Sequence, residues 1–139
     1  MARTVEEIMT RDPQTVSADD PVVEAARIMR DRDIGDVIVL QNGDVGGIVT
    51  DRDIVVRGLA DGRDPQSTSV SEVCTTGIEA IEPSASVDDA LRKMRDADIR
   101  RLPVVEGGRA VGIISLGDLA VEREPDSTLA DISAAAPDQ

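Results

Sequence analysis

The chain of 139 residues carries a net charge of −13 and contains no His, Phe, Tyr or Trp. So negative a balance repels a phosphate backbone, and no aromatic ring is available to stack on bases, so we expect no nucleic-acid partner. The absence of His, the single Cys and the lack of a long apolar run lead us to expect a cytoplasmic protein with no enzymatic activity, no metal site and no membrane insertion.

The first half of the sequence predicts short helices that alternate with strands. Thr4 and Glu7 have the spacing of a capping box, which predicts a short helix from Val5. Apolar residues at helical spacing after Pro21 predict a second helix that ends near Ile34-Gly35. The other expected elements are an extended stretch at 14–17, strands at 36–40 and 45–49 joined by an Asn42-Gly43 turn, and a helix that begins at Thr50 and ends near Gly58–Gly62. Ile54, Val55 and Leu59 of this helix are expected to face mainly the core.

The second half repeats the first at a constant offset of 65 positions. The recurring segments are Val5–Thr10 with Val70–Thr75, Met29–Ile34 with Met94–Ile99, and Gly47–Ile54 with Gly112–Leu119. A repeat of this length indicates two copies of one supersecondary unit. The second copy predicts helices at 70–74, after Ser86 and after Ser115, and strands at 79–82, 102–105 and 110–114.

The repeat also sets the expected domain organisation and fold class. We divide the chain into units at 1–62 and 70–122, a polar linker at 63–69, and a tail at 123–139 that could add a short helix at 127–132. Each unit is of the α+β class, with helices on one face of a small sheet. Packing the two sheets face to face would cover the apolar face that the helices leave open.

The sharpest motif, Gly-Ile-x-Thr/Ser-x-x-Asp, occurs in both halves where a strand ends and a helix begins. Its hydroxyl and carboxyl residues are Thr50 and Asp53 in the first copy and Ser115 and Asp118 in the second. The unpaired N–H groups of a helix start can hold a phosphate, and a carboxylate one turn on can accept the hydroxyls of a ribose. The same spacing is also that of a capping box, so both interpretations stay open.

Three further features bear on a binding site. Arg100 and Arg101 precede a predicted strand, where they could attract a phosphate or simply offset acidic neighbours. The equivalent position in the first half holds Asp36, which would repel a phosphate, so the two halves are chemically unequal. Cys74 is expected to be a small core residue.

These segments together resemble a tandem pair of CBS domains, also called a Bateman module. The resemblance is carried by IMTRDPQTVSADDPVVEAARIM, GIVTDRDIVVRGLADG and RRLPVVEGGRAVGIISLGDL, and it covers about residues 3–122. It implies a small stand-alone bacterial protein of two β-α-β-β-α units, related by a pseudo-twofold axis, with their sheets facing across a central cleft. It also implies a homodimer.

The resemblance further implies adenosine-containing ligands, such as AMP, ADP, ATP or S-adenosylmethionine, in clefts between the units. In each cleft the Asp would bind the ribose hydroxyls, the Ser or Thr would contact phosphate or ribose, and the arginines would hold phosphates. The residues so implied are Ser115, Asp118, Arg100 and Arg101 in one site and Thr50 and Asp53 in the other. The residues implied to enclose the adenine are Thr15, Val16, Val37, Ala80, Ile81 and Leu102.

The expected function is therefore a regulatory sensor of adenosine-containing ligands, without catalysis, whose change of packing is read by an unidentified protein partner. The alternative is a ligand-free scaffold for protein interactions. An apolar helix face left over after core packing would be a dimer interface.

Overall fold

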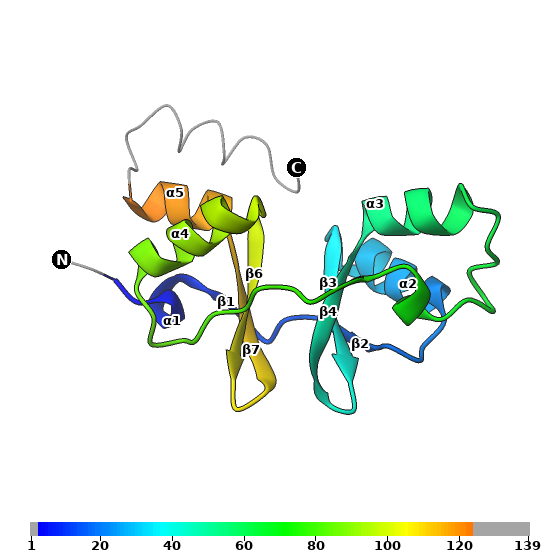
Figure 1. Cartoon of the computed structure of the whole chain (residues 1–139), viewed down its shortest axis with the longest axis horizontal. Coiled ribbons are helices and arrows are strands. Elements are labelled where there is room, and N and C mark those ends of the chain that lie inside the picture. The colour runs from blue at the N-terminus through cyan, green and yellow to red at the C-terminus, as the bar shows by residue number, and fades with distance from the viewer. Residues whose placement is uncertain (1–2, 124–139) are drawn as a thin grey trace. The chain divides into compact units, whose positions relative to one another are not determined.

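The computed structural model describes residues 3–123, and the chain forms two compact units (Figure 1). The first unit is Gln14–Ile78. The second unit combines residues 3–13 with residues 79–123. The repeats in sequence are therefore not the units in space, because the opening segment of each repeat packs with the body of the other.

The first unit is built on a four-stranded sheet of order β2-β3-β4-β5. Its strands are β2 Thr15–Ser17, β3 Asp36–Gln41, β4 Asp44–Thr50 and β5 Thr75–Thr76. β2 runs parallel to β3, and the other pairs are antiparallel. Asn42 and Gly43 both have positive φ in the tight turn between β3 and β4, as the sequence predicts.

Helices cover one face of this sheet. They are α2 Val22–Arg32, the short α3 Asp51–Asp53, which continues as a π-helix η1 Ile54–Leu59, and a 3₁₀ helix η2 Val70–Glu72. The core includes Val22, Ala25 and Met29 from α2, Val37, Val39 and Val49 from the sheet, and Val70 and Val73 from the segment after the linker.

The second unit has a three-stranded sheet of order β1-β7-β6. Its strands are β1 Thr10–Arg11, β6 Arg101–Glu106 and β7 Arg109–Ser115, all antiparallel, and its helices are α1 Val5–Ile8, α4 Val87–Ala97 and α5 Leu116–Arg123. Ser86 caps α4 as predicted, because its hydroxyl accepts the N–H of Asp89 at 3.0 Å.

The N-terminal segment is an integral part of the second unit. The Val5 N–H donates to the Ala85 carbonyl at 2.8 Å, and Val5 itself is fully buried in the core that contains Leu102 and Ile114. Val70 has the same role in the first unit, where it is also fully buried. Both segments begin with a capping box, at Thr4 as the sequence predicts, and also at Ser69.

The predicted α+β class with two β-α-β-β-α units is confirmed, and two local predictions are corrected. The second helix ends at Arg32, because Asp33 adopts the left-handed conformation (φ 56°) and terminates it before Ile34. The predicted strand at 79–82 is only an isolated bridge between Ile81 and Val104. In the first unit Ala18 donates its N–H to the next strand, whereas the equivalent Pro83 has no N–H to donate.

A third correction concerns the helix after β4. Ile54 is buried, as predicted, but Val55 and Leu59 are more than half exposed, and so they do not face the core. The π-helical turn places Ile54 and Gly58 on the buried side of the helix. There Gly58 faces the Val73 side chain. The predicted short helix at 127–132 lies outside the described residues.

Candidate functional site

Strand register in the second unit brings the predicted polar residues to one end of the β6–β7 hairpin. Arg101 at the start of β6 lies opposite Ser115 at the end of β7, and Leu102 lies opposite Ile114. The chain then turns directly into α5, whose first N–H, on Leu116, donates to the Arg100 carbonyl at 2.7 Å. Arg100, Arg101 and Ser115 therefore meet where a helix begins.

The Ser115–Asp118 pair forms the reciprocal bonds of a helix cap. The Ser115 hydroxyl accepts the Asp118 N–H at 3.1 Å, and Asp118 Oδ2 accepts the Ser115 N–H at 3.3 Å. The capping interpretation is thus confirmed. The cap engages only Oδ2 of Asp118. Because Asp118 is exposed, its other carboxylate oxygen, Oδ1, stays accessible.

The first unit repeats this arrangement with different surroundings. Thr50 lies opposite Asp36, and Thr50 and Asp53 form the same reciprocal cap, with distances of 3.0 and 3.1 Å. Here the second carboxylate oxygen, Oδ1 of Asp53, lies 3.9 Å from Arg57 Nε, and the Asp53 side chain is only 13% exposed. The Asp53 carboxylate is therefore less available to a ligand than that of Asp118.

The apolar residues of the predicted sites lie mostly inside their units. Parallel pairing places Thr15 beside Ile38 and Val16 beside Val39, and the bridge to Val104 places Ile81 at the edge of β6. The side chains that belong to the cores are Val16, Val37, Ile81 and Leu102. Among the residues expected around an adenine, Thr15 and Ala80 are those that keep partial exposure.

The glycine of the motif has a role that sequence reasoning missed. A Cβ on Gly47 would collide with the Thr75 carbonyl oxygen, and a Cβ on Gly112 would collide with the Met9 sulfur and lie 2.9 Å from the Thr10 carbonyl oxygen. Both glycines admit the short strand contributed by the other repeat. The sequence contained a signal for this close approach, because Thr10 and Thr75 are separated by the same 65 positions as Gly47 and Gly112.

Cys74 is buried, as the sequence predicts, and burial raises the pKa of its thiol, with a smaller contribution from the Asp53 carboxylate. Because the thiolate is the reactive form, we expect iodoacetamide to modify Cys74 slowly at pH 8 in the folded protein and rapidly in 6 M guanidinium. Mass spectrometry over time measures both rates. Equal rates would contradict the burial of this thiol.

Within residues 3–123, no cluster of three acidic, Cys or His side chains could hold a metal ion. The helices in this part of the chain are all too short or too polar to cross a membrane.

The fold and the two equivalent strand–helix junctions define a duplicated α+β module. The chain belongs to the CBS domain family, whose sequence pattern matches residues 5–59 and 70–123. It is 42% identical over 120 residues to the CBS domain-containing protein YhcV of Bacillus subtilis, covering 86% of this chain and 85% of that one. It is 35% identical over 118 residues to hypoxic response protein 1 of Mycobacterium tuberculosis, covering 84% and 82% of the two chains.

Solved structures agree with this assignment. A crystal structure of hypoxic response protein I with two coordinated zinc ions matches with a TM-score of 0.78 and 34% identity, covering 85% of this chain and 97% of that one. A putative signal-transduction protein with CBS domains from Burkholderia ambifaria matches with a TM-score of 0.78 and 33% identity, covering 91% and 97%. CBS-domain pairs are in general regulatory, ligand-binding modules, which sets the class of function.

Proposed function

We propose that this protein is a cytoplasmic, non-catalytic sensor that binds an adenosine-containing ligand, such as AMP, ADP, ATP or S-adenosylmethionine, at the Ser115–Asp118 junction. The observation that carries the proposal is the exposed Asp118 carboxylate, at a helix start, beside the backbone of two arginines. A carboxylate accepts both hydroxyls of a ribose, and the arginines supply the positive charge that phosphates require.

The cap at Ser115 is compatible with this role. Within the described residues, Asp118 Oδ2 is the oxygen that holds the Ser115 N–H, and Oδ1 has no hydrogen bond there. One carboxylate can therefore cap the helix and bind a ligand at the same time. The Thr50–Asp53 junction is the second candidate, because Asp36 would repel a phosphate there and Arg57 lies beside the Asp53 carboxylate that would bind the ribose.

The proposal includes a homodimer and a protein partner that reads the bound state. Association is found in the family, since one matching structure is a hexameric CBS-CP12 protein from cyanobacteria with a TM-score of 0.76 and 30% identity. Ligand binding can act on a partner only if the ligand binds one arrangement of the protein better than another.

Calorimetric titration of the purified protein with AMP, ATP and S-adenosylmethionine tests the ligand directly. We expect saturable binding of at least one of them, with about one site per chain at the lower concentrations. The proposal is excluded if none of the three binds at millimolar concentration.

Two substitutions at Asp118 separate ligand binding from helix capping. We expect Asp118→Ala to weaken binding by about 1.5–3 kcal/mol, the range for hydrogen bonds to a charged group, and to lower stability by about 1 kcal/mol. Asp118→Asn keeps one oxygen for the cap, so it should lose affinity while its melting temperature stays near that of the wild type. Calorimetry and thermal unfolding measure the two effects.

The ligand chemistry provides the control for this prediction. The wild type should prefer the ribose form over the 2′,3′-dideoxy form of the ligand that binds, and both variants should lose that preference. If Asp118→Asn binds as tightly as the wild type, the carboxylate serves the cap alone. Asp53→Asn is the matched variant in the first unit, and it should change affinity less.

The alternative function, a ligand-free scaffold for other proteins, is favoured by one observation. Val55, Val56 and Leu59 are exposed on η1, and exposed apolar side chains that gather on one helix mark interaction surfaces. Nucleotide released on denaturing the freshly purified protein would speak for the sensor. A co-purified protein without nucleotide would speak for the scaffold.

A further inference from the structure

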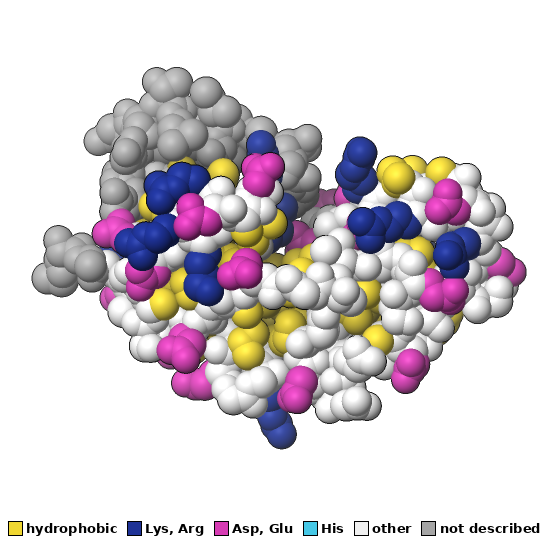
Figure 2. All heavy atoms as spheres, viewed as in Figure 1, with side chains coloured by type: hydrophobic (Ala, Val, Ile, Leu, Met, Phe, Trp, Pro, Cys, Tyr) yellow, Lys and Arg dark blue, Asp and Glu magenta, His cyan; other side chains and the backbone are white. Residues whose placement is uncertain are grey.

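The turn between β3 and β4 exposes the only asparagine of the chain, Asn42. Asn42 and its successor Gly43 are both exposed, at the end of a hairpin that extends below the helices of the first unit (Figure 1). Figure 2 shows mainly uncharged polar side chains and backbone at the lower end of this unit, where the hairpin ends. Water therefore reaches both residues.

An asparagine that precedes a glycine can react with its own backbone. The glycine nitrogen loses its proton to hydroxide and attacks the Cγ atom of the asparagine side chain. The new N–Cγ bond closes a cyclic imide, and the side-chain nitrogen takes a proton from water and leaves as ammonia. Water then adds to either carbonyl of the ring, which opens to aspartate or to isoaspartate. The reaction needs no reactant besides water, and it is favoured because the two reacting groups belong to neighbouring residues.

Both reacting groups at this turn are unoccupied. Within residues 3–123, neither the Asn42 side chain nor the Gly43 N–H makes a hydrogen bond. A Cβ built on Gly43 would find no atom within 4 Å, so the space beside the attacking nitrogen is open. The attack requires a rotation about the Cα–C bond of Asn42, which disturbs the turn. We expect this rotation to cost little, because exposed loops lie at the low end of the free energies of local opening.

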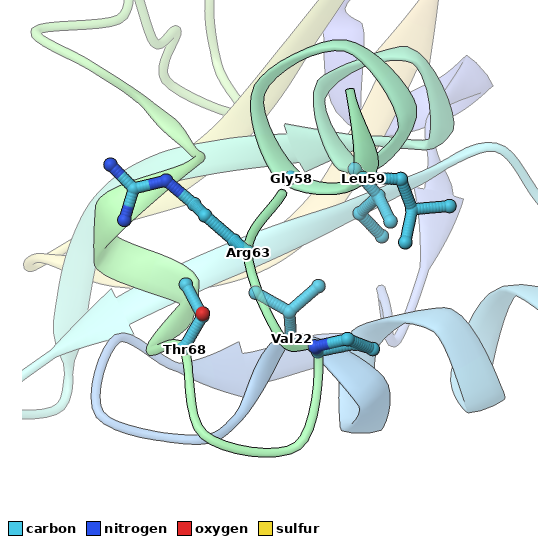
Figure 3. Close-up of a pocket in the computed structure, with 7 residues that line it drawn as sticks. Val22, Gly58, Leu59, Arg63 and Thr68 are labelled. Carbon is cyan, nitrogen blue, oxygen red and sulfur yellow. The ribbon is translucent and has the colours of Figure 1, made fainter. Parts of the chain in front are cut away.

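The one Asp-Gly pair of the chain, Asp61-Gly62, could form the same ring but is held differently. The Gly62 N–H donates to the Leu59 carbonyl at 3.0 Å, so the attacking nitrogen is occupied. Figure 3 shows Gly58, Leu59 and Arg63 of this stretch beside a hollow of about 180 Å³ that they help to line. A carboxylate also accepts the attack less readily than an amide does. The reactivity is therefore expected at Asn42.

The second unit has the same turn without the reactive amide. Gly107 and Gly108 are at the equivalent positions, with φ of 60° and 82°, compared with 55° and 86° for Asn42 and Gly43. The turn itself therefore does not require an asparagine. Its presence at position 42 gives the reactive site to the first unit alone.

We propose that Asn42 is a site of spontaneous modification, at which the side-chain amide of the folded protein is converted to aspartate or isoaspartate. Aspartate is compatible with the turn, because it adopts positive φ readily, as Asp12, Asp33 and Asp98 of this chain already do. This product adds a negative charge to a chain whose net charge is −13.

Isoaspartate has a different effect, because its main chain runs through the former side chain. The backbone of the two-residue turn then becomes one carbon atom longer, and the pair Gln41–Asp44 that closes the hairpin no longer matches it. This product should therefore loosen the end of the β3–β4 hairpin. The inference is independent of the ligand and of the partner in the proposed function.

Incubation of the full chain at pH 8 and 37 °C, followed by mass spectrometry of the tryptic peptide 33–52, tests the proposal. We expect the mass gain of an amide-to-acid conversion at Asn42, at a rate within about tenfold of that in the guanidinium-unfolded chain, which corresponds to an opening cost of at most about 1.4 kcal/mol. A native rate that is lower than this would show that the turn protects Asn42, and it would overturn the proposal.

Two variants make the test specific to the turn. Asn42→Gly copies the turn of the second unit, so it should fold normally and show no mass gain. Gly107→Asn places an amide before Gly108, and a Cβ at position 107 would meet no atom within 4 Å. We expect this variant to gain a second conversion at a similar rate. A mass gain that persists in Asn42→Gly would assign the reaction to another residue and would also overturn the proposal.

The two products can be separated by chromatography against synthetic peptides of both forms. Asn42→Asp represents the aspartate product and should unfold like the wild type. In the isoaspartate form, we expect hydrogen exchange at Gln41 and Asp44 to be faster by about tenfold or more, because the end of the hairpin opens more easily. Equal exchange in the two forms would contradict the predicted loosening of the turn.

Discussion

Replacing Val5 by Asp is expected to unfold the second unit and to leave the first unit folded, although Val5 lies in the first sequence repeat. Val5 is fully buried among Leu102, Ile114 and Leu119. Losing its apolar burial costs about 1.5–3 kcal/mol, and burying an unpaired carboxylate costs several kcal/mol more. Their sum is comparable with the whole stability of a small domain, about 5–15 kcal/mol.

Val70→Asp is the matched variant, because Val70 is the equivalent of Val5 and is fully buried in the core of the first unit. We expect the opposite outcome, with loss of the first unit and retention of the second. Hydrogen exchange followed by mass spectrometry measures both, through the amides of β3 and β4 for one unit and of β6 and β7 for the other. Glu6→Ala, next to Val5 and exposed, serves as the control and should change neither.

The same experiment shows to which unit the opening segment of each repeat belongs. If Val5→Asp removed protection from β3 and β4 instead, each repeat would form its own unit and the exchange of segments would be wrong. Unfolding of both units together in both variants would show that they form one cooperative block.

Local features of the structure could be predicted from the sequence because short-range chemistry determines them. The Asn42-Gly43 turn needs positive φ at both residues, and Ser86 and Thr4 cap helices that start next to them. The exchange of opening segments could not be predicted this way. Val5 and Val70 are equally apolar, and nothing in their neighbourhood says which sheet each will join.

The same distinction applies to the candidate site. Spacing alone predicts that Ser115 and Asp118, or Thr50 and Asp53, form a reciprocal pair, and both pairs do. The difference in availability between the two carboxylates depends on Arg57, one turn further along the helix and held near Asp53. The exposure of Leu59 depends on the π-helical turn, which shifts the residues that a regular α-helix would bury.

Gly47→Ala is the second substitution with a large expected effect, although it adds only one methyl group. In β4, the added Cβ would collide with the Thr75 carbonyl oxygen of β5, and a backbone atom cannot move away without opening the β4–β5 pairing. Overpacking of this kind costs about 1–3 kcal/mol. Because β5 leads from the segment that carries Val70 and Val73 into the sheet, loss of the pairing also loosens the core of the first unit.

The neighbouring Gly46→Ala is a control in the same strand. Its Cβ would lie 3.2 Å from the Gln41 Cβ, and the Gln41 backbone nitrogen, at 3.7 Å, would be in ordinary van der Waals contact. Gln41 is exposed, so its side chain is able to adjust. Since Ala also restricts the unfolded chain, this change should be neutral or stabilise by up to about 1 kcal/mol. Chemical denaturation of both variants measures the difference in their free energies of unfolding. Faster alkylation of Cys74 should accompany only Gly47→Ala, because the Cys74 sulfur lies 3.5 Å from the added methyl group. Equal stability of the two variants would mean that Gly47 is present in the motif for some reason other than the close approach of β5.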